Sequence, residues 1–381
     1  MGGGSLKIAL LGTRGIPANY GGFETCAEEL GARLVERGHT VSVYCRSHHV
    51  HYSQPYYRGM HLIRLPTIPN KYFDTITHAT IASLHTLTQN YDVVLMFIAG
   101  NSPVSFIPRL GGQRVALNVD GLDWKRRKWP PLAKKYIQFA EWLATKLPNE
   151  VVTDSQQVQD YYRTRYHAET NYIAYGSDVL PLPPGRFLEQ YGLTPRNYLL
   201  FVGRLVPENC AHHLVTAFPQ LKTDMKCVIV GDAPYADDYI RELKATAGAN
   251  VIFTGYLYGE GYRELSSHAY AFIETSEVGG THPALLEAMA FGNVVVVNDT
   301  RENLETVGDA GLSYHGIEGA ANLVQVLQSL IDNPERAEEF RCRAQERVHR
   351  HFSWDAVTDK YEELFQQMLK KSAPSQVTAT K

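Results

Sequence analysis

Short runs of β-branched and other apolar residues recur along this chain, with segments of helical spacing between them. The runs are four to six residues long and unbroken by polar alternation, which is typical of parallel strands buried on both faces. Strand and helix in repeated alternation predict two doubly wound α/β units. We expect the strands at Lys7–Leu11, Thr40–Cys45, His61–Leu65, Val93–Ile98, Arg114–Val119 and Glu150–Thr153, and then at Tyr198–Val202, Lys226–Val230, Asn250–Thr254, Ala269–Glu274 and Val294–Asn298.

The density of proline predicts where one unit ends and the next begins. Leu180–Gly185 is the most proline-rich stretch of the 381 residues, and such stretches favour linkers. A final helix near Trp354–Leu369 carries an apolar stripe that must be covered, and the first domain is one place for it to dock. We therefore expect a first domain over residues 6–180 plus 355–370, and a second over residues 181–354.

Composition and charge exclude several classes of protein. No run approaches the ~18 uncharged apolar residues of a transmembrane helix, and we expect no secretory leader. The five cysteines are scattered without C-x-x-C spacing, which argues against a disulfide framework and against a structural zinc site. We expect a cytoplasmic protein.

The net charge of −3 conceals a basic first half, because residues 1–180 hold 19 Lys and Arg against 14 Asp and Glu. That half could face an anionic substrate or an anionic membrane, or the two domains could simply differ in charge. The basic residues form no stripe of the kind that binds nucleic acid.

A glycine-rich segment, Gly12–Gly22, follows the first predicted strand and leads into a helix expected over Gly22–Arg37. Glycine allows close backbone approach, and the start of a helix offers unpaired N–H groups to an anion. The segment has neither the G-x-G-x-x-G spacing of dinucleotide sites nor the G-K-[ST] of a P-loop. We interpret it as a ligand loop, with a structural turn as the alternative.

Two segments of the second half suit a phosphorylated ligand. Arg204 directly follows a predicted strand and could contact a phosphate through two hydrogen bonds, or be a surface charge. Gly279 and Gly280 precede a helix that begins near Pro283, whose first amides could hold a phosphate. Glu287, one turn into that helix, could bind a hydroxyl pair or simply favour the helix dipole.

A third segment, Asn118–Trp129, begins where a first-half strand is expected to end. Asp120 and Asp123 suit general-base or hydroxyl-orienting work, although an aspartate before glycine also caps turns. The cations Lys125–Lys128, with a tryptophan on each side, could contact anionic lipid or a pyrophosphate. The alternative is a solvated charged face.

These segments together resemble family-4 retaining glycosyltransferases of the GT-B type. In the second half the resemblance is carried by Gly203-Arg204 with Pro207-Glu208, by Val230–Pro234 and by Leu285–Ala290. The first half is similar to the rhamnosyltransferase-like branch through Gly12–Pro17, Tyr20–Thr25, Asp120–Arg126 and Tyr175–Asp178. The resemblance extends from Lys7 to about Met368.

The resemblance implies two Rossmann-like domains that face each other across a cleft. It also implies transfer of a sugar, with retention, from a UDP- or dTDP-sugar to an acceptor hydroxyl. The implied roles are catalysis for Asp120 and Arg204, donor binding for Gly15, Gly21, Gly22, Arg204, Asn209, Gly279, Gly280, Thr281 and Glu287, and acceptor contact for Asp123, Trp124, Lys125 and Arg126. Within the donor set, Arg204 neutralises the diphosphate and Glu287 binds the ribose.

Two positions depart from the wider family, which has a lysine where this chain has Asn209 and a glutamate where it has Gly279. The narrower branch often shows both changes, and Glu277 is the nearest substitute carboxylate. No D-x-D stands where a metal–diphosphate site would need it, so we expect a metal-independent enzyme without a cofactor.

The expected partners are a nucleotide sugar and a carbohydrate or lipid-linked acceptor, in polysaccharide or glycolipid synthesis, with peripheral contact to the inner membrane face as an option. Two rivals stay open. One is a nucleotide-sugar epimerase or phosphorylase on the same architecture, and the other is a non-catalytic nucleotide-sugar-binding regulator.

Overall fold

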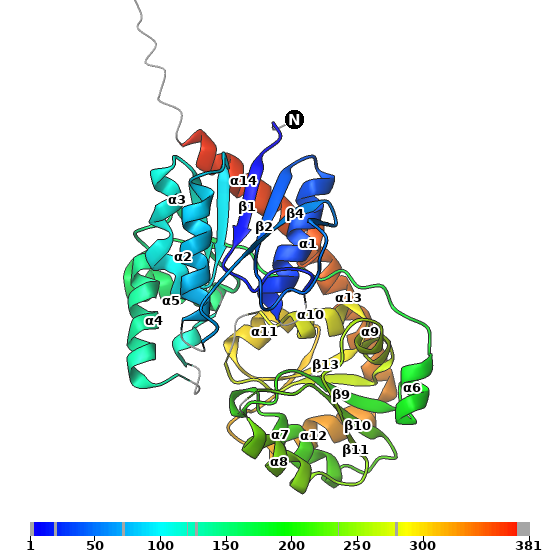
Figure 1. Ribbon diagram of the computed structural model, residues 1–381. Coiled ribbons are helices and arrows are strands. Elements are labelled where there is room, and N and C mark those ends of the chain that lie inside the picture. Colours follow the sequence, from blue (N-terminus) through cyan, green and yellow to red (C-terminus); the bar gives the residue numbers. More distant parts are fainter. Residues whose placement is uncertain are drawn as a thin grey trace, which may run out of the picture.

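Two layered α/β units make up this computed structural model, which describes residues 4–18, 21–70, 73–119, 121–125, 129–234, 236–278 and 281–371 (Figure 1). Over these residues the first sheet has the strand order β3-β4-β2-β1-β5-β6-β7-β8 and the second β11-β10-β9-β12-β13-β14. The strands are β1 (Lys7–Leu11), β2 (Thr40–Arg46), β3 (Tyr56–Tyr57), β4 (Met60–Leu65), β5 (Val93–Phe97), β6 (Arg114–Asn118), β7 (Glu150–Thr153), β8 (Asn171–Tyr172), β9 (Tyr198–Val202), β10 (Lys226–Val230), β11 (Val251–Gly255), β12 (Ala271–Glu274), β13 (Val294–Asn298) and β14 (Leu312–Tyr314).

Helices cover both faces of each sheet. They are α1 (Gly22–Glu36), α2 (Asp74–Thr86), α3 (Phe106–Leu110), α4 (Pro131–Ala144), α5 (Gln156–Tyr166), α6 (Arg186–Tyr191), α7 (Ala211–Ala217), α8 (Asp237–Thr246), α9 (Gly259–His268), α10 (Pro283–Ala290), α11 (Arg301–Val307), α12 (Ala320–Ile331), α13 (Pro334–His351) and α14 (Trp354–Lys370). In the described part of the chain, no helix combines the length and the apolar character needed to cross a membrane.

The strand order in both sheets is that of a doubly wound dinucleotide-binding fold. The second sheet follows the order 3-2-1-4-5-6 throughout, and the first follows it from β4 to β7. Neighbouring strands are parallel except at the β3–β4 edge, where a hairpin pairs them antiparallel. The expectation of two Rossmann-like units is confirmed.

Burial of the strands on both faces explains why the sequence lacks alternation. In β1, Ile8 and Leu10 join one core cluster with Leu30 of α1. The intervening residues Ala9 and Leu11 join another cluster on the opposite face. Since both faces need apolar side chains, the strand reads as one continuous apolar run.

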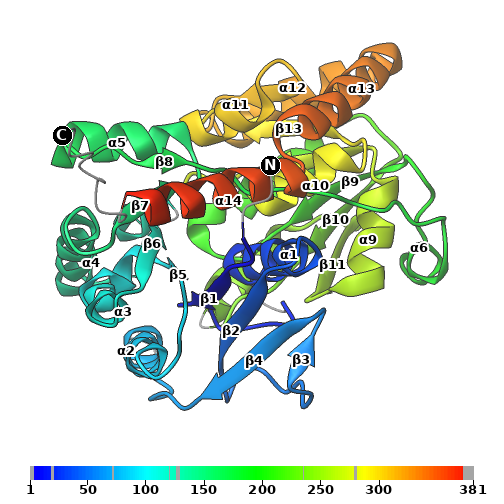
Figure 2. The same ribbon diagram turned by 90° about the horizontal axis from the view of Figure 1, so that it is seen from above.

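The C-terminal helix α14 lies alongside α1 and packs on the first domain (Figure 2). Its Tyr361 hydroxyl accepts a hydrogen bond from Asn118 Nδ2 at 2.9 Å, at the end of β6. Arg37, at the end of α1, pairs with Asp359 at 2.6 Å and with Glu362 at 2.5 Å. The chain therefore crosses between the domains twice, once near residue 180 and once before α14.

Gly231 lies where the loops that follow β9 and β10 of the second sheet approach each other closely. Its φ is +137°, and a Cβ on it would lie 1.9 Å from the carbonyl oxygen of Gly203. Its N–H donates to the Gly255 carbonyl at 2.9 Å. The loops that follow β9 and β10 can approach this closely only because residue 231 has no side chain.

Gly231→Ala should lower the free energy of unfolding by about 3 kcal/mol or more, since it combines a backbone clash with an unfavourable φ. Urea denaturation monitored by circular dichroism measures the change. Gly255→Ala is the matched control, because its φ is +71° but nothing lies within 4 Å of its Cβ position. The control should lose only about 1–2 kcal/mol, and equal losses in both variants would mean that the clash is absorbed by movement of the Gly203 loop.

Candidate functional site

The segments singled out in the sequence lie at the carboxyl ends of the central strands. The segment Gly12–Gly22 follows β1, which pairs with β5 on one side and β2 on the other. Arg204 follows β9, which lies between β10 and β12. In doubly wound sheets the strand order reverses at such positions, and ligands bind in the crevice that this leaves.

Packing explains two glycines of the first loop. Gly12 has a φ of +102°, and its Cβ would lie 2.5 Å from the Phe97 carbonyl oxygen. Gly15 has a φ of +112°, and its Cβ would lie 2.6 Å from Cβ of Cys45. At these two positions glycine is explained by the alternative of a structural turn, because the loop backbone packs directly against β5 and β2.

Two carboxylates of α1 hold this loop in place. Glu24 Oε1 accepts from the Arg14 N–H at 2.8 Å, and Glu28 Oε2 accepts from the Ala18 N–H at 2.7 Å. Glu24 is buried, and burial raises its pKa while the Arg14 contact opposes that effect. Arg46, also buried, pairs with Asp74 at 2.7 Å on the other side of the loop.

The starts of two helices from opposite domains meet at this site. A Cβ on Gly22, the first residue of α1, would lie 2.9 Å from Cγ of Pro283, the first residue of α10. Neither N-cap residue, Gly21 or His282, makes a side-chain cap. The positive ends of both helices therefore lie at the same place, an arrangement that favours a bound anion.

Further contacts join the two domains beside these helix starts. The Thr281 N–H donates to Asp154 Oδ2 at 3.1 Å, and its hydroxyl donates to the Asp154 carbonyl at 2.7 Å. Asp154 directly follows β7 of the first sheet. The Gln156 N–H donates to both carboxylate oxygens of Glu305 in α11, at 2.9 and 3.0 Å. The amide of Thr281 thus already binds a carboxylate in this conformation. Gly279 and Gly280 lie outside the described residues.

The Arg204 loop is fastened to the loop that precedes α10. Asn209 Nδ2 donates to the Arg204 carbonyl at 2.9 Å, and the Asn209 carbonyl accepts from the Thr275 hydroxyl at 2.5 Å. The Glu277 N–H donates to the Glu208 carbonyl at 3.0 Å. Arg204 is half-buried and Glu277 exposed. Since the buried amide of Asn209 bonds within the loop, its observed contacts are structural.

Glu287 lines a pocket of about 310 Å³ together with Tyr262, Arg263, Phe291 and linker residues such as Asp178. The Tyr262 hydroxyl donates to the Glu287 carboxylate. Burial raises the pKa of Glu287, and this hydrogen bond opposes the effect. Glu287 lies beyond the first turn of α10, and the effect of the helix dipole falls off within that turn, so the helix-dipole alternative is disfavoured. No sequence pattern indicates that Tyr262 or the linker belongs to this pocket.

The acceptor-side segment is described in part, since Asp120 and Arg126 lie outside the described residues. Asp123 Oδ2 accepts from Trp129 Nε1 at 2.8 Å. Trp124 is half-buried and packs near Tyr161, with ring centroids 6.4 Å apart. Lys125 is exposed, and its charge lowers the pKa of Glu302 in α11, which burial raises. Among the described residues of this segment, both tryptophans are thus half-buried and Lys125 is exposed.

Glu287→Gln tests whether this carboxylate is held at the expense of stability. The pKa of Glu287 is higher in the folded chain than the ordinary value of 4.5. The stability that the protonated Glu287 carboxyl contributes is therefore lost as the pH rises above that value. We expect Glu287→Gln to be at least as stable as the wild type at pH 7.5, with the advantage shrinking towards pH 4. Chemical denaturation at both pH values measures this. A loss of about 0.5–1 kcal/mol at pH 7.5 would restore the helix-dipole explanation.

Two family models match this chain, one in each domain. Residues 6–178 match the "Domain of unknown function (DUF1972)", and residues 187–347 match "Glycosyl transferases group 1". The O-antigen chain mannosyltransferase B of Escherichia coli is 28% identical over 198 residues, 50% of this chain and 51% of that protein. The chain thus spans about half the length of this relative.

Another relative is similar over most of its length. A GDP-mannose-dependent alpha-(1-6)-phosphatidylinositol monomannoside mannosyltransferase of Mycobacterium tuberculosis is 25% identical over 397 residues, 93% of this chain and 97% of that protein.

Solved structures share the fold at low identity. A sucrose-phosphate synthase from Thermosynechococcus elongatus superposes with a TM-score of 0.81 at 21% identity, covering 96% of this chain and 100% of the other. Anabaena HepE in complex with UDP has a TM-score of 0.74 at 17% identity, covering 95% and 100%. This chain therefore has the GT-B fold, its first domain matching the DUF1972 model and its second the group 1 glycosyltransferase model.

Proposed function

We propose that this protein transfers a sugar from a nucleotide diphosphate sugar to an acceptor hydroxyl, with retention of configuration and without a metal ion at the diphosphate. The donor would be a UDP- or dTDP-sugar carrying a hexosyl or rhamnosyl group. The acceptor would be a carbohydrate or a lipid-linked glycan in polysaccharide or glycolipid synthesis. Mannosyltransferases among the relatives add GDP-mannose to the donors worth testing.

The observation that carries the proposal is the meeting of α1 and α10 at Gly22 and Pro283. Two helix starts from opposite domains, whose N-cap residues make no side-chain cap, form a place for a doubly charged group. The Arg204 loop is tied to the segment that leads into α10, and its guanidinium would add the charge-assisted contact. For the diphosphate to use the Thr281 amide, the contact with Asp154 must open.

Sugar transfer passes through an oxocarbenium-like state while the diphosphate departs. Fixed N–H groups and a guanidinium stabilise the negative charge that develops on the leaving group. Glu287 would bind the ribose hydroxyls from the pocket that it shares with Tyr262. Gly15, Gly21 and Gly22 would bring the first loop over the phosphates.

Incubation with a panel of UDP-, dTDP- and GDP-sugars tests the activity directly. Slow donor hydrolysis supports the transferase, an epimerised sugar nucleotide supports an epimerase, and binding without turnover supports a regulator. Thermal shift detects binding, because a ligand that binds only the folded state raises Tm.

Arg204→Ala should weaken binding of the nucleoside diphosphate roughly ten- to a hundred-fold and lower turnover, because a charge-assisted contact contributes about 1.5–3 kcal/mol. Isothermal titration calorimetry measures the affinity. Arg241→Ala is the control, since Arg241 pairs with Asp238 on the exposed surface of α8. If Arg204→Ala keeps the affinity of the control, Arg204 is a surface residue.

Asp120 would orient the acceptor hydroxyl or stabilise positive charge while the departing phosphate takes the proton. Asp120→Asn should then leave donor binding intact and lower turnover by ~10²–10⁴-fold. Melting temperature and turnover are measured on the same preparation. Normal turnover with about 1 kcal/mol of lost stability would assign Asp120 to a turn cap, and Asp123 would become the next candidate.

Contact with an anionic membrane would involve α4. Its outward stripe exposes Leu132 (80%), Tyr136, Phe139 (53%) and Trp142, with the exposed Lys135 on the same face. Apolar and aromatic side chains mixed with lysine suit the interface of an anionic bilayer.

Co-sedimentation with vesicles tests this contact. The wild type should bind vesicles that contain anionic lipid and release them at high salt. A Leu132→Ser/Phe139→Ser variant should bind at least about tenfold more weakly, since each side chain contributes up to ~1.5–3 kcal/mol when buried. Ile317→Ser, which removes a fully exposed apolar residue of the second domain, should bind like the wild type. Equal binding by all three would exclude α4 as the contact surface.

A further inference from the structure

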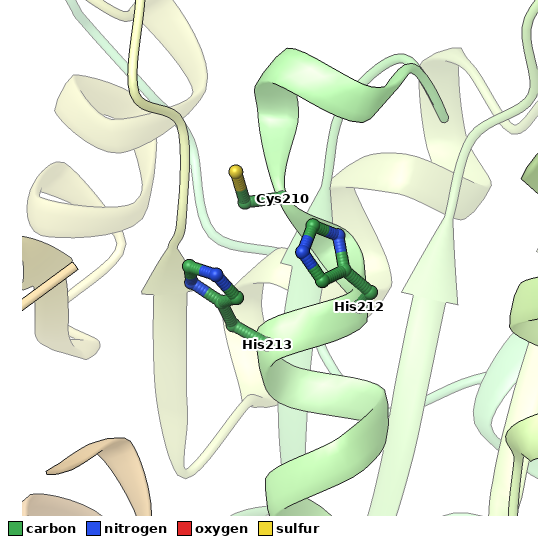
Figure 3. Close-up of side chains that lie close together, drawn as sticks. All are labelled: Cys210, His212 and His213. Atoms are coloured by element: carbon green, nitrogen blue, oxygen red, sulfur yellow. The ribbon is translucent and has the colours of Figure 1, made fainter. Parts of the chain in front are cut away.

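Cys210, His212 and His213 form a cluster of possible metal ligands at the start of α7 (Figure 3). One ligand atom from each residue lies within 4.8 Å of the other two. Figure 3 shows the thiol and the edges of both imidazole rings around a common space. Tetrahedral zinc has S and N ligands at about 2.3 and 2.0–2.1 Å, so each ligand would move by about 1 Å to bind a single ion.

Both histidines are oriented by tyrosine hydroxyls. Nδ1 of His212 lies 2.9 Å from the Tyr239 hydroxyl, and Nδ1 of His213 lies 2.9 Å from the Tyr314 hydroxyl. Metal-binding histidines typically donate the other ring N–H to an oxygen acceptor, which fixes the tautomer and the ring orientation, and a tyrosine hydroxyl oxygen can accept in this way. A cation would therefore bind through Nε2 of each ring.

The cysteine is held in an unusual backbone conformation. Cys210 has a φ of +50° and a ψ of +31°, in the left-handed region that β-carbon residues rarely adopt. The side chain is buried, and its sulfur contacts the Pro207 carbonyl at 3.4 Å. Strain of this kind is retained where the surroundings enforce it, and such residues gather at functional sites.

A second group of possible ligands, His48, His49 and Asp74, is less suitable. Its carboxylate is already paired with the Arg46 guanidinium at 2.7 Å. That fixed positive charge would oppose a divalent ion.

We propose that Cys210, His212 and His213 bind a zinc-class divalent cation through one thiolate and two imidazole nitrogens, with a fourth position left for water or an exogenous ligand. The thiol proton leaves to solvent when the Cys210 sulfur binds the ion. A thiolate and two imidazoles suit zinc or cobalt, and oxygen-seeking ions such as magnesium would not compete.

The site differs from the C-x-x-C zinc motifs that are missing from the sequence. Its ligands come from one Cys-x-His-His segment without a second cysteine. It also lies directly after Asn209, the residue that fastens the Arg204 loop. A bound ion would hold the end of that loop and the start of α7 together. Metal binding at this cluster does not require the proposed transferase activity.

Cobalt(II) added to the metal-stripped full chain tests the site. We expect thiolate-to-cobalt charge-transfer absorption and visible bands of tetrahedral cobalt, both displaced by one equivalent of zinc. Cys210→Ser and His213→Gln should lose the thiolate band or weaken zinc binding by at least about tenfold. Tyr314→Phe should weaken zinc binding ten- to a hundred-fold while the thiolate band persists. Zinc affinity is measured by competition with a chromophoric chelator.

Two controls keep the test decisive if a variant at Cys210 or His213 fails to fold. Cys342→Ser removes the exposed cysteine and should leave both spectrum and affinity unchanged. His48→Gln/His49→Gln should do the same. The proposal would be overturned if the wild type showed no cobalt–thiolate absorption. It would also be overturned if Cys342→Ser lost that absorption while Tyr314→Phe and His213→Gln retained it.

Discussion

The close approach of two helix starts across the domain interface is the constraint on which the site depends. Gly22 begins α1 and Pro283 begins α10, and any side chain at position 22 would collide with the proline ring. The positive ends of two helices repel each other unless negative charge lies between them. In this conformation carboxylates supply some of that charge, since Asp154 accepts from the Thr281 amide beside α10 and Glu24 accepts from the loop before α1. A diphosphate between the helices would supply more.

The remaining structure brings those helix starts together and keeps them there. The strand orders of both sheets place the loops after β1 and β9 at their reversal points. The α14 helix returns to the first domain and is held by Arg37 and by the Asn118–Tyr361 hydrogen bond. Glu305 of α11 accepts from the first turn of α5. Together these contacts limit how far one domain can move without the other.

Much of the fold was predictable, because strands buried on both faces leave continuous apolar runs. Five strands, β1, β7, β9, β10 and β13, begin and end at the expected residues. The two-residue strands β3 and β8 were missed because they are too short for any periodicity. The site was less predictable. Close packing requires glycine at positions 12 and 15, and the amide of Asn209 fastens a loop; neither role could be recognised from the sequence. The Tyr262–Glu287 hydrogen bond joins residues 25 positions apart, which no local pattern indicates.

The most direct test of diphosphate binding by the helix starts of α1 and α10 is a comparison of nucleotide affinities. The wild-type chain is titrated with UDP, UMP and uridine, and with the corresponding thymidine diphosphate, monophosphate and nucleoside. If the helix starts of α1 and α10 share a diphosphate, the second phosphate should strengthen binding at least about tenfold, as charge-assisted contacts do. The advantage should shrink as salt is added. Equal affinities for the diphosphate and the monophosphate in calorimetric titrations would contradict the claim, because the second phosphate would then gain nothing from the facing helix starts.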